Sequence, residues 1–131
     1  MVSSATGGRF AVVLNDRATG EAVVKFYAAT GILLDSVNFG GATFYGDFTY
    51  PTVSITALQN GNYAVFRDTG GSVVGQIYTS GGIASGVAFN LTDGSGSEYT
   101  PAATTLADGR IVVLYYDERG ATDGVGAQIF N

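Results

Sequence analysis

The side chains of this chain that could do acid–base chemistry are mainly carboxylates, because it contains no histidine and no cysteine. That composition excludes Ser-His-Asp triads, Cys-His dyads and zinc-thiolate sites. A glycosidase would need two carboxyl groups about 5–9.5 Å apart, one with a pKa raised by an apolar pocket. We expect no enzyme activity, because the loop carboxylates are flanked by Gly, Ser or Thr and look like solvated turn residues: Asp47, Asp93, Glu98, Asp117, Glu118 and Asp123. A glycosidase would instead lose activity when Asp117 or Glu118 is changed to alanine.

Two loops offer the carboxylate and hydroxyl oxygens that calcium prefers, and glycines would let each loop wrap around an ion. Neither loop matches the twelve positions of an EF-hand loop. The alternative interpretation is a polar hairpin loop rich in turn-forming residues. Calcium is the one cofactor that the sequence suggests, and its candidate ligands are Asp93, Ser95, Ser97 and Glu98 in one loop and Asp117 and Asp123 in the other.

Aromatic side chains beside carboxylates suit sugars, because a ring can cover the apolar sugar face while acids bind hydroxyl groups. Aromatic residues are also enriched in protein interfaces, so packing or a subunit contact is the alternative. The loops that follow the second strand of each predicted repeat, at 15–20, 68–72 and 117–124, occupy equivalent places where binding sites usually collect. The candidate ligand-binding residues are Phe44, Tyr45, Asp47 and Tyr50 in one set and Tyr115, Tyr116 and Asp117 in another.

Charge and composition restrict the partners. The chain has 131 residues, a net charge of −5 and only 6 basic residues, which are scattered singly. No basic stripe could neutralise phosphates, so nucleic acid and anionic membranes are not expected partners. No run of about 18 apolar residues could cross a bilayer, and the first residues lack a signal-peptide pattern. A Gly-rich, acidic chain without disulfides suggests an extracellular, cell-surface or virion-surface protein of bacterial or phage origin.

One short pattern occurs three times, at Gly8–Leu14, Gly61–Phe66 and Gly109–Leu114. A period of roughly 50 residues with strand-like content is typical of repeated all-β units such as propeller blades. One such unit cannot bury its apolar face alone, so the units must pack on each other or on another chain. We divide this single domain into repeats at about 1–48, 49–97 and 98–131.

Each repeat is predicted to hold up to four strands, because alternating or continuous apolar runs are bounded by glycine turns. Asn-Gly and Asp-Gly are expected to form two-residue hairpin turns. The continuous apolar runs of the second strands predict burial on both faces. The expected strands are 2–6, 51–58 and 101–106 (first), 10–14, 63–67 and 111–116 (second), 22–27, 73–78 and 125–130 (third), and 34–39 and 85–90 (fourth).

The third repeat stops before its fourth strand, which would leave an unpaired strand edge. Another chain could supply the missing strand, the N-terminal segment could fold back to supply it, or the chain could be part of a longer array. We therefore expect an all-β fold of three four-stranded antiparallel blade-like repeats, the third incomplete and completed by oligomerisation. The simplest assembly is a dimer that forms a six-bladed ring.

The second repeat carries two motifs, Pro-x-Val-x-x-x-x-Leu-x-x-Gly-x-Tyr-x-Val-Phe at 51–66 and Val-x-Gly-Gln-Ile-Tyr-x-x-x-Gly at 73–82. With these motifs, nearly the whole chain resembles the repeats of secreted bacterial adhesins of the RTX-type and cadherin-like, calcium-associated kind. The resemblance implies propeller-blade-like units and a role in adhesion. Two features depart from the pattern: the usual tryptophan is replaced by Leu14, Phe66 and Tyr115, and the usual aspartate by Ala28, Thr79 and Asn131.

Two function classes follow from these expectations. The first is a non-catalytic, lectin-like surface module that binds glycans through the inter-strand loops of an assembled propeller. The alternative is a structural, self-assembling subunit, such as a filament or virion decoration protein, without a small-molecule ligand. A binding module should give saturable glycan-array signals as a discrete oligomer, whereas a structural subunit should form filaments or need a larger partner.

Overall fold

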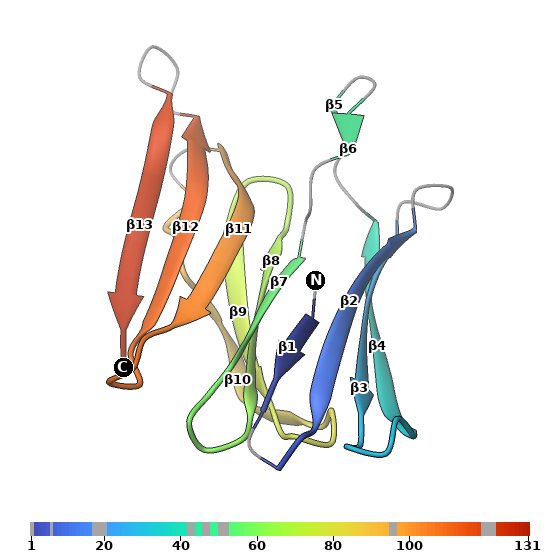
Figure 1. Ribbon diagram of the computed structural model, residues 1–131. Coiled ribbons are helices and arrows are strands. Elements are labelled where there is room, and N and C mark those ends of the chain that lie inside the picture. The colour runs from blue at the N-terminus through green and yellow to red at the C-terminus, as the bar shows by residue number, and fades with distance from the viewer. Residues whose placement is uncertain are drawn as a thin grey trace.

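The computed structural model describes residues 2–5, 7–16, 21–41, 44–45, 48–49, 53–94, 97–118 and 123–131. In these segments the chain forms strands and turns and no helix (Figure 1). No described segment is therefore an apolar helix of membrane-spanning length. The strands are β1 (Val2–Ser4), β2 (Phe10–Asp16), β3 (Glu21–Tyr27), β4 (Leu33–Gly41), β5 (Phe44–Tyr45), β6 (Phe48–Thr49), β7 (Val53–Ala57), β8 (Tyr63–Asp68), β9 (Val73–Tyr78), β10 (Ala84–Asn90), β11 (Ser97–Thr105), β12 (Ile111–Glu118) and β13 (Gly124–Phe130).

The described strands form three antiparallel sheets of four, four and three strands, each ordered as the chain runs. Sheet I contains β1–β4, sheet II contains β7–β10 and sheet III contains β11–β13. This confirms the all-β fold and the expected number of strands in each repeat. The short hairpin β5–β6 is an addition, since the sequence predicted only a loop there. It stands at the upper end of the molecule in Figure 1, where β2, β8 and β12 also end.

The three sheets share one register between their second and third strands. Phe10 pairs with Tyr27 in sheet I, Tyr63 with Tyr78 in sheet II, and Ile111 with Phe130 in sheet III. Because side chains alternate between the two faces of a strand, equal register places equivalent residues on equivalent faces.

The first strand of sheet III differs from its prediction. It begins at Ser97 rather than at Pro101, and its register shifts between Tyr99 and Ala102. Thr100 has a φ of 49° at this point. Pro101 therefore lies at a bulge inside the strand, which is another position that tolerates its missing donor.

The glycine turns are a residue longer than predicted. Gly61 N–H donates to Leu58 O, and Leu58 N–H donates to Asn62 O. Gly61 has a φ of 85°, whereas the preceding Asn60 is not in the left-handed region. This is a type I turn closed by a glycine bulge rather than a two-residue turn, and Leu106–Arg110 repeats it.

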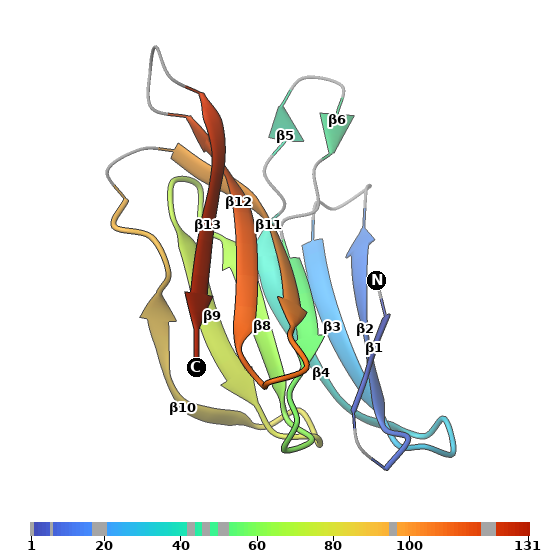
Figure 2. The same ribbon diagram turned by 60° about the vertical axis from the view of Figure 1, so that its left-hand side comes forward.

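The sheets lie face to face in the order III, II, I, as the two views in Figures 1 and 2 show. One core lies between sheets I and II, where Phe26 of β3 packs on Tyr63 and Tyr78. A second core lies between sheets II and III, where Phe66 of β8 packs on Phe130 of β13. Sheet II is therefore covered on both faces.

The prediction of two-faced burial is confirmed for β8, in which residues 63–66 are all buried. It is wrong for β12, which alternates between buried residues such as Val113 and exposed residues such as Leu114. The two strands differ because sheet II lies between two other sheets, whereas sheet III is the last sheet of the stack in the described structure and nothing there covers its outer face.

The first strands of sheets II and III are in direct contact. Ala103 N–H of β11 donates to Ser54 Oγ of β7 at 2.9 Å, and the hydroxyls of Thr56 and Thr105 are 2.9 Å apart. At the N-terminus, β1 pairs with β2 in sheet I. This strand therefore does not supply the missing strand of sheet III, which removes one of the three ways of completing that sheet.

Candidate functional site

Two cavities lie between neighbouring sheets. The first has a volume of about 280 Å³ and lies between β4 of sheet I and sheet II; its polar lining residues are Asn38, Arg67, Gln76 and Tyr78. The second has a volume of about 420 Å³ and lies between the segment after β10 and sheet III; its polar lining residues are Asn90, Thr92, Asp93, Tyr115 and Gln128. The first cavity is thus built from β4 of sheet I and β8–β10 of sheet II, and the second from the end of β10, the segment after it, and β12 and β13 of sheet III.

The two cavities occupy equivalent places in the repeat. Gln76 pairs with Val65 across β8 and β9, and Gln128 pairs with Val113 across β12 and β13. Arg67 and Tyr115 each stand two residues beyond these partners. Strand alternation therefore directs Arg67 towards sheet I and Tyr115 towards sheet II.

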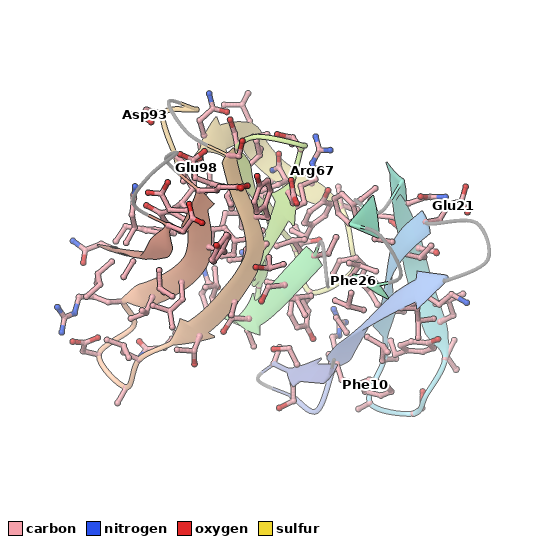
Figure 3. The ribbon with its side chains drawn as sticks, turned by 90° about the horizontal axis from the view of Figure 1, so that it is seen from above. Phe10, Glu21, Phe26, Arg67, Asp93 and Glu98 are labelled. Atoms are coloured by element: carbon pink, nitrogen blue, oxygen red, sulfur yellow. The ribbon has the colours of Figure 1, made fainter. Side chains whose placement is uncertain are left out.

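Among the described lining residues of the first cavity, Arg67 is the only charged one. Arg67 is half-buried, and no hydrogen bond or ion pair joins its guanidinium to another described residue. Burial raises the pKa of Tyr78 above its usual value, and the Arg67 charge opposes this increase in part. Figure 3 shows Arg67 between sheets I and II, seen from the end at which β8 finishes.

Gln76 is anchored by the outer strand of its own sheet. Its Nε2 donates to Ile77 O at 2.9 Å, to Ser85 O at 3.1 Å and, more weakly, to Gly86 O at 3.4 Å. Two of these acceptors lie where the register of β10 shifts, and Gly86 has a φ of 75° there. The amide nitrogen is therefore used, and the Oε1 atom is the part of Gln76 that remains to accept a hydrogen bond.

In the second cavity Tyr115 forms a buried wall. A Cβ atom at its cross-strand partner Gly126 would overlap the Tyr115 ring. The ring therefore occupies the space that a side chain at position 126 would need. Asp93 is exposed at the rim. Beneath it, Thr92 Oγ1 accepts from Val73 N–H at 3.0 Å and donates to Glu98 Oε2 at 3.3 Å.

The first predicted ligand set is described only in part. Phe44 and Tyr45 form β5, and their side chains lie outside the described residues. Asp47 and Tyr50 lie outside the described residues altogether. The structure therefore places only Phe44 and Tyr45 of this set, on the first strand of the β5–β6 hairpin.

The second predicted ligand set is divided between two faces of β12. Tyr115 is buried between sheets II and III, whereas Tyr116 points outwards and is stacked on Tyr99 with ring centroids 6.1 Å apart. Asp117 is half-buried on the same face as Tyr115. Tyr115 instead shares a cavity with Asp93, which the sequence had assigned to a separate calcium loop.

The structure brings two of the candidate metal ligands together. Glu98 is fully buried and stands directly opposite Asp117 in the β11–β12 pair. Ser97 is half-buried at the start of β11, Asp123 is exposed before β13, and Ser95 lies outside the described residues. Figure 3 shows Asp93 and Glu98 on the side of sheets II and III. Within the described ranges, no three acidic side chains gather closely enough to hold a metal ion.

Sequence reasoning did not select Arg67, Gln76 or Asn38. A signal for Gln76 existed, because a glutamine occupies the same third-strand position at Gln128. Arg67 gave no signal of this kind, since Leu14 and Tyr115 stand at its equivalent positions. Only the stacking of the sheets turns Arg67 and Gln76 towards a shared cavity, whereas Asn38 pairs with Val23 on the outer face of sheet I.

Comparison of the chain with known protein families and with curated proteins gives no match in either case. The fold and the cavities are therefore the basis for any assignment of function.

Proposed function

We propose that the protein is a non-catalytic, lectin-like binding module that works as an assembly of stacked sheets, closed by a second copy into a propeller-like ring. The observation that carries this proposal is the equivalence between the buried faces inside the stack and the exposed faces at its two ends. A surface or extracellular location belongs to the same proposal.

The exposed face of sheet I supports stacking. In sheet II the face that carries Tyr63 and Val65 is buried against sheet I. Phe10 and Val12 are their equivalents in sheet I, and Leu14 on the same face is 45% exposed. The outer face of sheet I thus has the same apolar pattern as the face of sheet II that packs on sheet I, so another sheet could pack on it.

The exposed face of sheet III has the complementary character. In sheet II the face that carries Ala64 and Phe66 is buried against sheet III. In sheet III the equivalent of Phe66 is Leu114, which is 44% exposed, with Ile129 exposed beside it on β13. The outer face of sheet III therefore has the apolar pattern of a face on which another sheet packs. Sheet I of another copy would supply that sheet.

Such a contact joins two different surfaces, and contacts of this kind close into rings or continue as filaments. In a dimer, sheet III of each copy would meet sheet I of the other, and six sheets would surround one axis. The contact between the first strands β7 and β11 supports this arrangement, because first strands adjoin at the axis of a propeller.

Glycan binding is supported by the two inter-sheet cavities. They combine amide side chains, an arginine or a tyrosine, and apolar walls in a repeated place. Small-molecule sites generally consist of such apolar walls with a few converging polar groups. Repeated sites in an assembly would also allow multivalent binding.

The second candidate is a structural subunit that forms filaments. It is favoured by the same exposed end faces, because a contact that fails to close would continue without limit. Light scattering separates the two functions: the binding module is expected at twice the 13.4 kDa chain mass, whereas a structural subunit gives large, concentration-dependent particles.

A charged substitution tests the proposed contact. Leu114→Asp would bury a carboxylate in the interface, so the variant should be monomeric at concentrations at which the parent protein is a dimer. Val87→Asp is the control, because Val87 is 87% exposed on the outer strand β10, away from both end faces. A monomeric parent protein at all concentrations, or identical masses for the two variants, would contradict the proposal. A glycan array probed with the dimer then tests ligand binding.

A further inference from the structure

We propose that the first inter-sheet cavity binds the carboxylate of an acidic sugar residue, such as a uronic acid, with the Arg67 guanidinium as its partner. The inference rests on the proposed glycan-binding function and adds the chemical class of the ligand and the residue that selects it.

The charges around Arg67 carry this inference. The chain has 11 acidic residues and 6 basic ones, yet no acidic residue lines the first cavity among its described lining residues. By contrast, Arg110 is paired with Asp108 at 2.7 Å on the exposed surface. A half-buried arginine without a carboxylate partner among the described residues is suited to an anionic ligand, which its guanidinium can bind through two parallel hydrogen bonds.

The other polar groups of the cavity suit sugar hydroxyls. Gln76 Oε1 is held in place by the bonds of its amide nitrogen and can accept from a hydroxyl group. The Tyr78 phenol is protonated at neutral pH, and burial raises its pKa further above the usual value, so it can donate. Val74 and Ala88 provide apolar walls for the C–H face of a sugar ring.

The cavity has room for about one sugar residue. The volume of about 280 Å³ is near the lower end of the range for small-molecule pockets, roughly 300–1,000 Å³. The second cavity has Tyr115 in place of Arg67 and an acidic residue, Asp93, at its rim. Selection of a carboxylate is therefore expected of the first cavity alone.

Calorimetric titration with methyl β-glucuronide and methyl β-glucoside tests the inference, because the two sugars differ in one carboxylate. The protein should bind the glucuronide about tenfold or more tightly, as expected for a charge-assisted pair. Arg67→Gln should abolish this preference and Arg67→Lys should keep part of it. Arg110→Gln, at an exposed arginine, should leave it unchanged.

Equal affinity of the unmodified protein for the two sugars overturns the inference, as does a preference that survives Arg67→Gln. Acetate that competes as well as the glucuronide also overturns it, since the site would then recognise a carboxylate without the sugar. These results leave glycan binding at other sites intact. A glycan array without any signal for the assembled protein removes both the inference and the proposed function.

Discussion

The Tyr63 hydroxyl lies buried in the core between sheets I and II. It has no hydrogen-bond partner among the described residues. The neighbouring Ala5 amide, which favours the ionised phenol, already donates to Arg9 O at 2.8 Å. The equivalent residues of the other repeats, Phe10 and Ile111, carry no hydroxyl. The packing of this position therefore depends on the apolar ring and not on its polar atom.

Tyr63→Phe is expected to leave the free energy of unfolding unchanged or raise it by up to about 1 kcal/mol, because the variant removes a buried polar atom without a partner. Burial raises the pKa of Tyr63 above its usual value of 10.0, although Ala5 and Arg9 oppose the increase. The folded state then holds the proton more tightly than the unfolded state, so stability is full below pH 10 and falls as the pH rises further. The variant should lose less stability above pH 10, as urea unfolding at several pH values would measure. A lower stability at pH 7, or an equal alkaline loss, would contradict this account.

At the scale of single residues, the sequence showed which kinds of side chain could bind a ligand, but it did not show which of them lie on the same face. Tyr115 and Tyr116 are adjacent and looked like one aromatic set, but strand alternation places them on opposite faces of β12. Nothing in the sequence singled out Arg67, and only the fold shows that it lines a cavity. Which face of a strand meets another sheet depends on stacking, and no local pattern contains that information.

At the scale of elements, the strands were predictable because apolar alternation and turn glycines are local signals. The bulge in β11 was not, because the φ of Thr100 and the position of Pro101 result from fitting β11 onto both β12 and β7. The sequence also did not predict that the Gln76 side chain anchors β10. It depends on Gln76 reaching carbonyl groups that are exposed only where β10 shifts its register.

Gln76→Ala should loosen β10 and lower the free energy of unfolding by about 1–2 kcal/mol, because two good hydrogen bonds and a weaker one are lost. Hydrogen exchange should show faster exchange of the β10 amides in this variant. Gln128→Ala is the matched control, since β13 has no following strand in the described structure for Gln128 to hold. Equal effects of the two substitutions would mean that Gln76 does not anchor β10.

At the scale of the whole molecule, the three sheets are equivalent units stacked through equivalent faces, and the stack ends in two faces that carry exposed apolar side chains such as Leu14 and Leu114. Repeat proteins gain much of their stability from contacts between neighbouring units. Exposed faces of this kind mark interaction sites in soluble proteins. We therefore expect sheet III of one copy to pack on sheet I of another in the way that sheets II and III pack within the chain.

Cross-linking between single-cysteine variants can detect this contact between copies, because the chain contains no cysteine of its own. Within the chain, the rings of Phe66 and Phe130 lie 5.7 Å apart across the contact between sheets II and III. Their equivalents at the ends of the stack are Leu114 and Tyr27. A mixture of the Leu114→Cys and Tyr27→Cys variants, treated with a short thiol cross-linker, should yield a covalent dimer that neither variant gives alone. Absence of that product in the mixture, or an equal yield from one variant alone, would contradict the account.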